Sequence, residues 1–143
     1  MRKEDFPVPV RANQFQGVLD MLFRLLLSIL DLAIGIGAKR NKAMKDMIKS
    51  HNQAFVIKTK DDKIGRRFIF KNGRYSSDKV ITEYDMALVF ESADAGFKAL
   101  ALGGENGIQD AINDWKLLIL GDDFHMIWFG VIMQMALGAS KRK

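Results

Sequence analysis

The feature that most constrains this chain is an apolar stretch near its C-terminal end, residues 114–137 (DWKLLILGDDFHMIWFGVIMQMAL). Residues 116–120 read as a short buried strand. Asp122 or Asp123 can cap a helix at 124–137, because carboxylates accept hydrogen bonds from the free N–H groups of a first turn. Only three residues break the apolar run of that helix, namely His125, Gly130 and Gln134. A helix that is apolar nearly all round must be covered on every side or face another apolar phase. A chain of 143 residues has few other residues that could cover this helix, so the stretch indicates a protein that binds lipid rather than an enzyme.

Residues 17–38 form a second apolar stretch, GVLDMLFRLLLSILDLAIGIGA. Its polar or small positions recur every three or four residues and so share one stripe of a helix, comprising Asp20, Arg24, Ser28, Asp31 and Gly35. The stretch is long enough to span a bilayer, but each of its three charges would cost roughly 2.5–3.5 kcal/mol near the membrane centre. Three placements stay open: packing on the domain or on a partner, lying in a membrane interface, and crossing a membrane. The side chains predicted to meet a membrane or partner are Leu22, Leu26, Ile29, Ala33, Lys39 and Arg40.

The composition narrows the possible classes of protein. The length predicts one domain with an added segment, and 48% hydrophobic with 27% charged residues is typical of a globular chain. The absence of cysteine excludes disulfides, thiolate catalysis and cysteine-based zinc sites. A net charge of +5 favours an anionic partner, either a membrane surface or a nucleic acid.

The first residues carry charges and two prolines instead of a secretory signal. We therefore expect an extended leader at 1–14 and a cytoplasmic, peripheral membrane protein.

After the N-terminal helices the hydrophobic period changes to alternation, which indicates strands. The first strand places three side chains on one face, Phe55, Ile57 and Thr59. A second strand at 66–71 does the same with Phe68 and Phe70. Asn72-Gly73 is the strongest hairpin signal in the chain, because both residues tolerate the positive φ of a type I′ turn. With a third strand at 74–76, this region predicts an antiparallel meander.

The meander also carries the net charge. Between residues 53 and 81 there are eight basic and three acidic side chains, so this segment alone accounts for a charge of +5. Two interpretations are open, a solvated outer face or a docking surface for anionic lipid headgroups. Arg67, Phe68, Phe70 and Tyr75 mix basic and aromatic side chains, as an RNA-binding sheet does. The RNP1 pattern is missing, however, and Phe68 and Phe70 read as core residues, so we do not expect a nucleic-acid partner.

The second half of the chain continues with a strand at 86–91 (MALVFE), a helix at 93–102 that Ser92 can cap, and a helix at 105–113. The run AINDWKLLILGDD then resembles the Gly-Lys-Leu-x-Ile-x-Gly-Asp pattern that precedes the last helix of the sterol carrier protein 2 family. The matching residues are Lys116, Leu117, Ile119, Gly121 and Asp122. Trp115 departs from the pattern, since it stands where the family usually has glycine. The resemblance covers about residues 53–137.

This resemblance implies an α+β fold, with a five-stranded, mostly antiparallel sheet covered by helices. Residues 1–50 lie largely outside the resemblance, and their apolar stretch adds an extra hydrophobic N-terminal helix. The resemblance divides the chain into a helical segment at 15–52 and a lipid-binding domain at 53–143. It also implies an apolar tunnel between sheet and helices, lined here by Phe68, Phe70, Leu88, Phe90, Phe97, Leu100, Leu117, Ile119, Phe124, Ile127, Trp128, Val131 and Met135. Such a wall would accept a lipid tail at roughly 0.8 kcal/mol per buried CH₂. The same side chains could instead fill an ordinary core.

The second face of the predicted sheet is partly apolar as well. Leu118 and Leu120 are apolar where the family alternates to polar residues. The other apolar side chains predicted on that face are Val56, Ile69, Ala87 and Val89. We hypothesise that the helix at 17–38 docks either on the lipid side or on this face of the sheet, and a membrane or a second subunit is the alternative cover for this face.

The sequence shows no catalytic constellation, and we expect no enzyme activity, cofactor or metal. His125 follows Asp122 by three residues but has no third metal ligand near it in the sequence. The predicted function is non-enzymatic binding, and possible transfer, of a sterol, acyl chain or isoprenoid at a membrane surface. The alternative is an accessory protein that presents a lipid-soluble intermediate to a membrane-associated enzyme complex, or scaffolds that complex. A protein partner or a homo-oligomer would form through the N-terminal helix.

Overall fold

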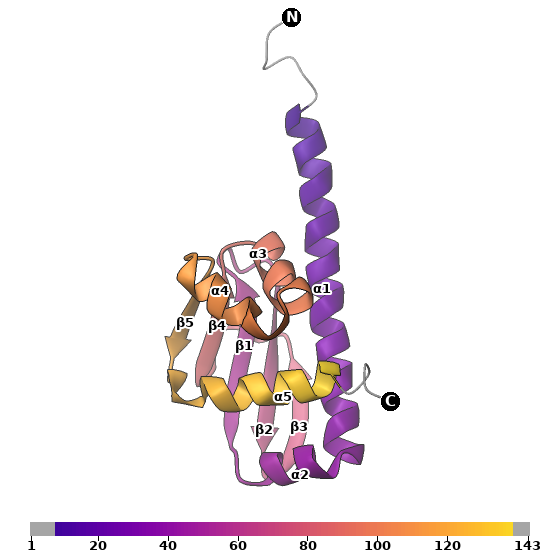
Figure 1. Ribbon diagram of the computed structural model, residues 1–143, viewed down its shortest axis with the longest axis vertical. Coiled ribbons are helices and arrows are strands. Elements are labelled where there is room, and N and C mark those ends of the chain that lie inside the picture. The colour runs from indigo at the N-terminus through magenta and orange to yellow at the C-terminus, as the bar shows by residue number, and fades with distance from the viewer. Residues whose placement is uncertain (1–7, 139–143) are drawn as a thin grey trace, which may run out of the picture.

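The computed structural model describes the backbone of residues 8–138, and the side chains between residues 17 and 136 other than those at 105 and 123. It has the expected α+β fold. The strands are β1 (Gln53–Thr59), β2 (Gly65–Lys71), β3 (Arg74–Asp78), β4 (Met86–Phe90) and β5 (Leu117–Gly121). They form one sheet in the order β3-β2-β1-β4-β5 (Figure 1). Strands β1 and β4 pair in parallel and the other neighbours pair antiparallel, which confirms the mostly antiparallel sheet and its meander.

Two turns of the sheet depend on positive φ angles. Asn72 and Gly73 have φ of 55° and 76°, so the predicted type I′ hairpin between β2 and β3 is present. Trp115, just before β5, has φ of 60°, a conformation that costs glycine little and other residues more. The low cost of a positive φ for glycine also explains why the family pattern has glycine at this position. Strand β5 begins at Leu117, one residue later than expected.

The helices are α1 (Val8–Arg40), α2 (Lys42–Lys49), α3 (Ala93–Phe97), α4 (Gly107–Asn113) and α5 (Met126–Gly138). Shorter turns connect them, a π-helical η2 (Lys98–Leu102) and the 3₁₀ turns η3 (Gly104–Asn106) and η4 (Asp123–His125). Both predicted caps form: the backbone N–H of Ala95 donates to the Ser92 hydroxyl, and that of Phe124 donates to the Asp122 carboxylate, each at 3.1 Å.

The leader expected at 1–14 is helical in the part that the structure describes. Residues 8–14 form the first turns of α1, and residues 1–7 lie outside the described chain. Pro9 is compatible with this helix because the first N–H groups of a helix have no intrahelical partner to lose. The extended conformation predicted from the prolines is therefore wrong for residues 8–14.

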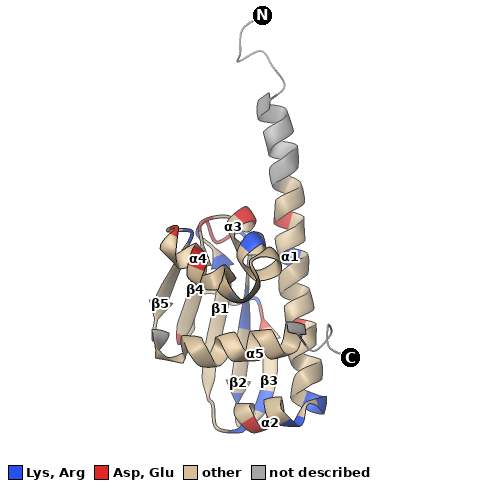
Figure 2. Ribbon diagram, in the orientation of Figure 1, with Lys and Arg blue, Asp and Glu red and all other residues tan. Residues whose placement is uncertain are grey.

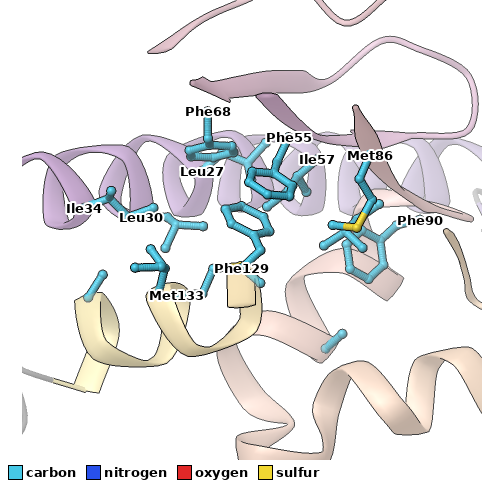
Figure 3. Close-up of a cluster of buried hydrophobic side chains, with 14 of the residues drawn as sticks. Leu27, Leu30, Ile34, Phe55, Ile57, Phe68, Met86, Phe90, Phe129 and Met133 are labelled. Carbon is cyan, nitrogen blue, oxygen red and sulfur yellow. The ribbon is translucent and has the colours of Figure 1, made fainter. Parts of the chain in front are cut away.

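Helix α1 belongs to the core of the domain. Its inward side chains are at most 2% exposed, namely Phe23, Leu27, Leu30 and Ile34. They pack in one cluster with Phe55 and Phe68 of the sheet and Phe129 of α5 (Figure 3). A Cβ at Gly96 would lie 2.6 Å from the Phe23 ring, so this glycine lets α3 approach α1 closely. By length and composition Gly17–Arg40 could also cross a membrane, with a mean hydropathy of 1.9, but a helix in the core of a domain can meet the same criteria.

The hypothesis that residues 17–38 cover the second face of the sheet is therefore wrong. A separate cluster on that face joins Val56, Ala87 and Val89 to Ile81 and Tyr84, which lie in the loop between β3 and β4. This loop covers part of the outer face because its own apolar side chains reach the sheet. Leu118 and Leu120 remain 57% and 36% exposed.

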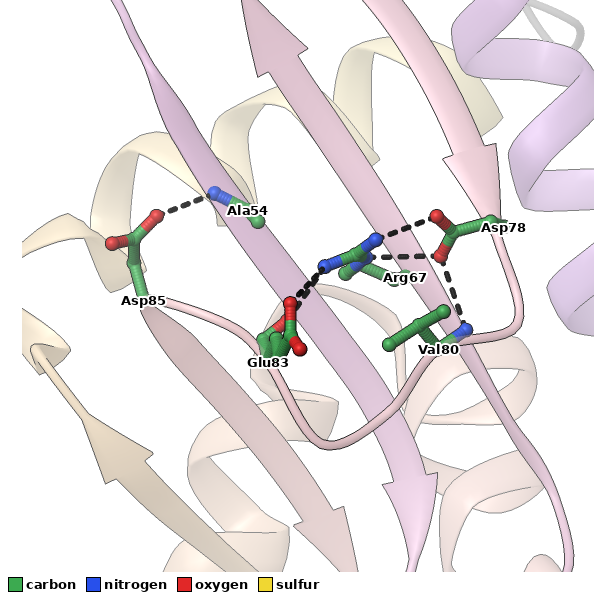
Figure 4. A network of polar contacts seen from close by, with 6 residues as sticks. All are labelled: Ala54, Arg67, Asp78, Val80, Glu83 and Asp85. Carbon is green, nitrogen blue, oxygen red and sulfur yellow. Dashed lines mark hydrogen bonds and ion pairs between the residues drawn. The ribbon is translucent and has the colours of Figure 1, made fainter.

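Polar contacts hold this loop in place (Figure 4). The Arg67 guanidinium donates two hydrogen bonds to the Asp78 carboxylate, at 2.9 and 2.6 Å, and one to the Glu83 carbonyl oxygen at 3.1 Å. At the other end of the loop, the backbone N–H of Ala54 donates to Asp85 at 2.7 Å. The side-chain hydrogen bond to Arg67 lowers the pKa of Asp78, so this pair stays charged near neutral pH.

The polar stripe of α1 faces the β3 edge of the sheet. Asp31 accepts hydrogen bonds from the Tyr75 hydroxyl at 2.6 Å, the Ser77 hydroxyl at 2.7 Å and the Arg66 guanidinium at 2.9 Å. Burial, followed by the hydrogen bond to Asp31, raises the pKa of Tyr75, so its hydroxyl stays protonated and keeps donating. These contacts fix the side of α1 that faces the sheet.

Three of the eight basic side chains predicted on the meander are paired within the domain. Lys58 contacts Asp62, Arg66 contacts Asp31, and Arg67 contacts Asp78. Figure 2 shows the remaining cations spread over the ends of several elements rather than gathered on one strand. These pairs reduce the number of meander cations that an anionic surface could engage.

Candidate functional site

The sheet residues predicted to line a tunnel are buried against one another and against α5. These are Phe68, Phe70, Leu88, Phe90 and Leu117, each at most 5% exposed. The ring of Phe129 stacks on Phe55 with a centroid distance of 4.3 Å and an interplanar angle of 5°, and it lies 5.8 Å from Phe68 (Figure 3). The described side chains thus fill the centre of this layer, and the grooves described below lie at its margins.

Three residues predicted on the inward face of the C-terminal helix point outward: Phe124 lies in η4, just before α5, and Ile127 and Val131 lie on the outward face of α5. Phe124 and Ile127 are 82% and 80% exposed, and Val131 is 38% exposed. The inward side chains are instead Phe129, Ile132, Met133 and Ala136. The predicted orientation is wrong because α5 is apolar on nearly every side, so its periodicity does not distinguish one face from another. Sequence reasoning therefore missed the four inward residues.

The other predicted site residues lie at the borders of the core. Leu100, Ile119, Trp128 and Met135 are half-buried and pack against it, and Phe97 is also half-buried. On α1, Leu26 and Ala33 pack against the same core, Leu22 is half-buried and Ile29 is 47% exposed. Lys39 and Arg40 are exposed at the end of the helix.

One groove of about 710 Å³ lies beside β5, at the sheet edge opposite α1. Predicted residues Leu117 and Ile119 line it together with Val89 and the 87% exposed Trp115. Charged side chains surround these apolar residues, since Lys60, Glu91 and Lys116 also line the groove. Lys116 and Glu91 form an ion pair at 2.8 Å. The polar rim makes this groove a weaker match for a lipid tail than the one described next.

A second groove, of about 450 Å³, lies between α1, α2 and α5; we call it the α1–α5 groove. Its wall is apolar apart from Arg40 and Asn41, and consists of Ala33, Ile36, Gly37, Met44, Met135 and Ala136. Gly37 brings α2 close, because a Cβ there would lie 2.6 Å from the Met44 sulfur. Within the described residues, no hydrogen bond or ion pair engages the Arg40 side chain. Size and lining both fit a lipid tail with one cation at the mouth.

Next to this layer, the two histidines of the chain come together around Trp128. The His51 ring stacks on Trp128 with a centroid distance of 3.9 Å, and lies 5.9 Å from the His125 ring. Nε2 of His125 is 3.2 Å from Nε2 of Gln53 and 3.5 Å from the Asp122 carboxylate. Buried atoms of His51, Gln53 and Trp128 have no hydrogen-bond partner among the described residues. Sequence reasoning missed this cluster because 73 residues lie between the two histidines in the chain.

Comparison with known proteins shows the fold. No protein-family model matches the sequence, and no curated protein matches it. A solved structure titled UbiJ-SCP2 ubiquinone synthesis protein superposes on this chain with a TM-score of 0.52 and 12% sequence identity. The superposition covers 90% of this chain and 96% of that one. The fold is that of a sterol carrier protein 2-like domain.

The likeness to the sterol carrier protein 2-like fold extends beyond the residues that carry the sequence resemblance. Residues 53–143 are less than two thirds of the chain, whereas the superposition covers 90% of it. Part of the N-terminal helical segment is therefore included. This agrees with the packing, in which α1 and the sheet share one hydrophobic core.

Metal ligands do not gather in the part of this sterol carrier protein 2-like domain that the structure describes. No group of three or more His, Asp or Glu side chains there is arranged to hold an ion. The pair formed by His125 and Asp122 has Gln53 as its other polar neighbour. The contact between His125 and Gln53 thus joins η4 to the start of β1.

The cluster around Trp128 predicts a pH dependence of stability. Burial, followed by the nearby His125, lowers the pKa of His51 below 6.5. The unfolded chain then binds a proton at His51 at a higher pH than the folded chain does, so stability falls as the pH drops through about 6.5. We expect the melting temperature to fall between pH 7 and pH 5.5, and the variant His51→Gln to show a shallower fall. Equal slopes for the two proteins would contradict this assignment.

Proposed function

We propose that this protein binds a single-chain lipid, an acyl chain or an isoprenoid, without catalysing its conversion. The observation that carries the proposal is the α1–α5 groove, with its apolar wall and the exposed guanidinium of Arg40 at its mouth. Two methionines line it, Met44 and Met135, and their unbranched side chains adapt to ligands of different shape. The sterol carrier protein 2-like fold supports the same class of function.

The proposed binding mode places the tail of the lipid between the helices. Ala33 and Gly37 keep the α1 wall shallow, so a chain could lie between α1 and α5 against Ala136. Every methylene that leaves water there is worth about 0.8 kcal/mol. A carboxylate or another anionic headgroup would meet Arg40, whereas a neutral isoprenoid would bind by its tail alone.

The test measures the binding of two ligands. Binding of cis-parinaric acid is followed by the fluorescence of this fatty acid, and binding of a short-chain ubiquinone is followed by the quenching of tryptophan fluorescence. Ala33→Trp fills the groove, and we expect it to weaken both ligands at least tenfold. Arg40→Gln should weaken only the fatty acid, by about tenfold, because it removes one charge-assisted hydrogen bond. Matched controls are Ala43→Trp and Lys42→Gln, which alter exposed positions of α2 outside the groove.

Each result has a clear meaning. Loss of binding in Ala33→Trp with retention in Ala43→Trp supports the groove as the site. Equal binding by all four variants would place the lipid elsewhere, and absence of binding by the unaltered protein would overturn the proposed function. Mass spectrometry of an organic extract of the purified protein identifies a lipid that is retained during purification.

A second function, presentation of a lipid-soluble intermediate to an enzyme, is favoured by the outward face of α5. Ile127 and Val131 expose apolar surface on α5, the helix that lines one side of the groove, and Phe124 of η4 is also exposed. The structural neighbour is titled a ubiquinone synthesis protein, which suits an accessory role. A transfer assay between donor and acceptor vesicles separates the two functions, because a carrier releases its lipid to acceptor vesicles and a presenting protein retains it.

A further inference from the structure

The outward face of α1 carries an apolar seam that the domain leaves uncovered. Six large side chains along it are 46–65% exposed, namely Val18, Met21, Leu25, Ile29, Leu32 and Ile36. They lie on the side of the helix opposite the core-facing residues, since Phe23, Leu27, Leu30 and Ile34 occupy positions about half a helical turn away. The seam extends for about 27 Å at 1.5 Å per residue.

The charges around the seam do not fit a membrane surface. Helices that lie on membranes usually present Lys and Arg beside the apolar face. Between Val18 and Ile36 the sequence has no lysine and one arginine, Arg24, whose guanidinium donates to the Lys63 carbonyl oxygen at 3.3 Å. Asp31 is engaged by β2 and β3. The polar flank of α1 is thus turned toward its own domain. An apolar protein surface therefore suits the seam better than a charged membrane surface does.

The spacing of the seam is that of a coiled coil. Five of its six members recur at intervals of seven, four, three and four residues, as Val18, Leu25, Ile29, Leu32 and Ile36, and the half-buried Leu22 completes the alternation of four and three. This alternation places Leu22, Ile29 and Ile36 at a positions, and Val18, Leu25 and Leu32 at d positions, of a heptad. The part from Leu25 to Ile36 therefore has isoleucine at a and leucine at d. β-Branched residues at a with leucine at d favour two parallel strands. We propose that the seam binds the seam of a second copy of this chain, to form a parallel α1–α1 homodimer.

The arrangement of the domain is compatible with this partner. Because the core lies on the other side of α1, the two domains of a dimer would sit on opposite sides of the helix pair. Helix α1 also projects well beyond its own domain at its N-terminal end (Figure 1), so the domain does not obstruct that end of the seam. The flanking g positions are Met21, Ser28 and Gly35, which bring no like charges together. Covering the seam would bury on the order of 500 Å² per copy, or about 1,000 Å² in total, which is below the roughly 1,600 Å² of a standard interface and near the lower limit for a specific one.

The first test is the mass of the full-length chain in solution, by light scattering and sedimentation at micromolar concentration. We expect a dimer, and a monomer for the double variant Leu25→Glu/Leu32→Glu, with at least a hundredfold weaker association. Leu118→Glu is the matched control, because Leu118 is 57% exposed on the sheet and Leu25 is 55% exposed on α1. Circular dichroism confirms that each variant is folded. A monomeric unaltered protein, or a dimer that only Leu118→Glu dissociates, would overturn the proposal.

The second test uses the absence of cysteine from the sequence. In a parallel dimer each d position faces its own copy, so Val18→Cys and Leu32→Cys should each form a disulfide-linked dimer on mild oxidation. Ala43→Cys, at an exposed position of α2, should stay monomeric under the same conditions. Cross-linking only in a mixture of the two seam variants would show an antiparallel pair and overturn the parallel arrangement. A monomer that binds neutral phosphatidylcholine vesicles through the seam would show a membrane as the occupant, and so would also overturn it.

Discussion

Replacing Phe129 by alanine is expected to lower the free energy of unfolding by about 3–5 kcal/mol, the usual cost of removing a fully buried aromatic ring. Phe129 is 0% exposed, stacks on Phe55 and lies near Phe68 and Phe70. Removal of the ring leaves a void between α5 and the sheet, because these neighbours belong to strands that cannot move independently. Chemical denaturation followed by circular dichroism measures the change.

Ile127→Ala is the control for this experiment, since Ile127 lies on the same helix and is 80% exposed. Its expected effect is within about 0.5 kcal/mol. The comparison also tests whether the layer is a filled core. If Phe129 lined an open tunnel, alanine there would remove few contacts, and a loss below about 1 kcal/mol would contradict the packing described above.

The second large effect is expected at Asp31, where alanine should lower the free energy of unfolding by about 2–4 kcal/mol. The carboxylate accepts three hydrogen bonds, from Tyr75, Ser77 and Arg66, and each bond to a charged group is worth about 1.5–3 kcal/mol before relaxation and solvent screening. Asp31 and Arg66 are 23% and 19% exposed, so water compensates only part of the loss. Arg66 would also be left partly buried without its anion.

Asp46→Ala is the matched control for Asp31→Ala. Asp46 lies on α2, is 57% exposed and contacts Lys49 at 3.9 Å, and its removal should change stability by no more than about 0.5 kcal/mol. Tyr75→Phe removes one of the three bonds and should give an intermediate loss of about 1 kcal/mol. Similar losses for Asp31→Ala and Asp46→Ala would show that the network does not hold α1 against the sheet.

Local sequence patterns predicted most of the sheet. The alternation of Phe55, Ile57 and Thr59 marks the inward face of β1, and the turn residues Asn72 and Gly73 set the hairpin. These features depend on neighbours in the chain, because strand period and turn conformation are local properties. The order of the elements then indicated the sterol carrier protein 2-like fold, which the structural comparison shows.

The candidate site depended on contacts that no local pattern records. The α1–α5 groove joins residues from the first and last helices, and the cluster at Trp128 joins His51 to His125 across the fold. The predicted tunnel residues on the sheet were placed on the correct face, yet their rings meet one another and Phe129. Whether facing apolar side chains leave a space between them is decided by the distance between layers, which the sequence does not give.

The sequence by itself determined which segments become strands and helices, and which strand faces are buried. The tertiary structure alone decided how the two apolar helices are turned. Helix α5 is apolar nearly all round, so burial of Phe129 against Phe55, and not periodicity, selects its inward face. Helix α1 is apolar on two opposite sides, and the hydrogen bonds of Asp31 to β2 and β3 select the side that enters the core. A helix without a single polar face is oriented by its long-range contacts, because its own pattern permits more than one orientation.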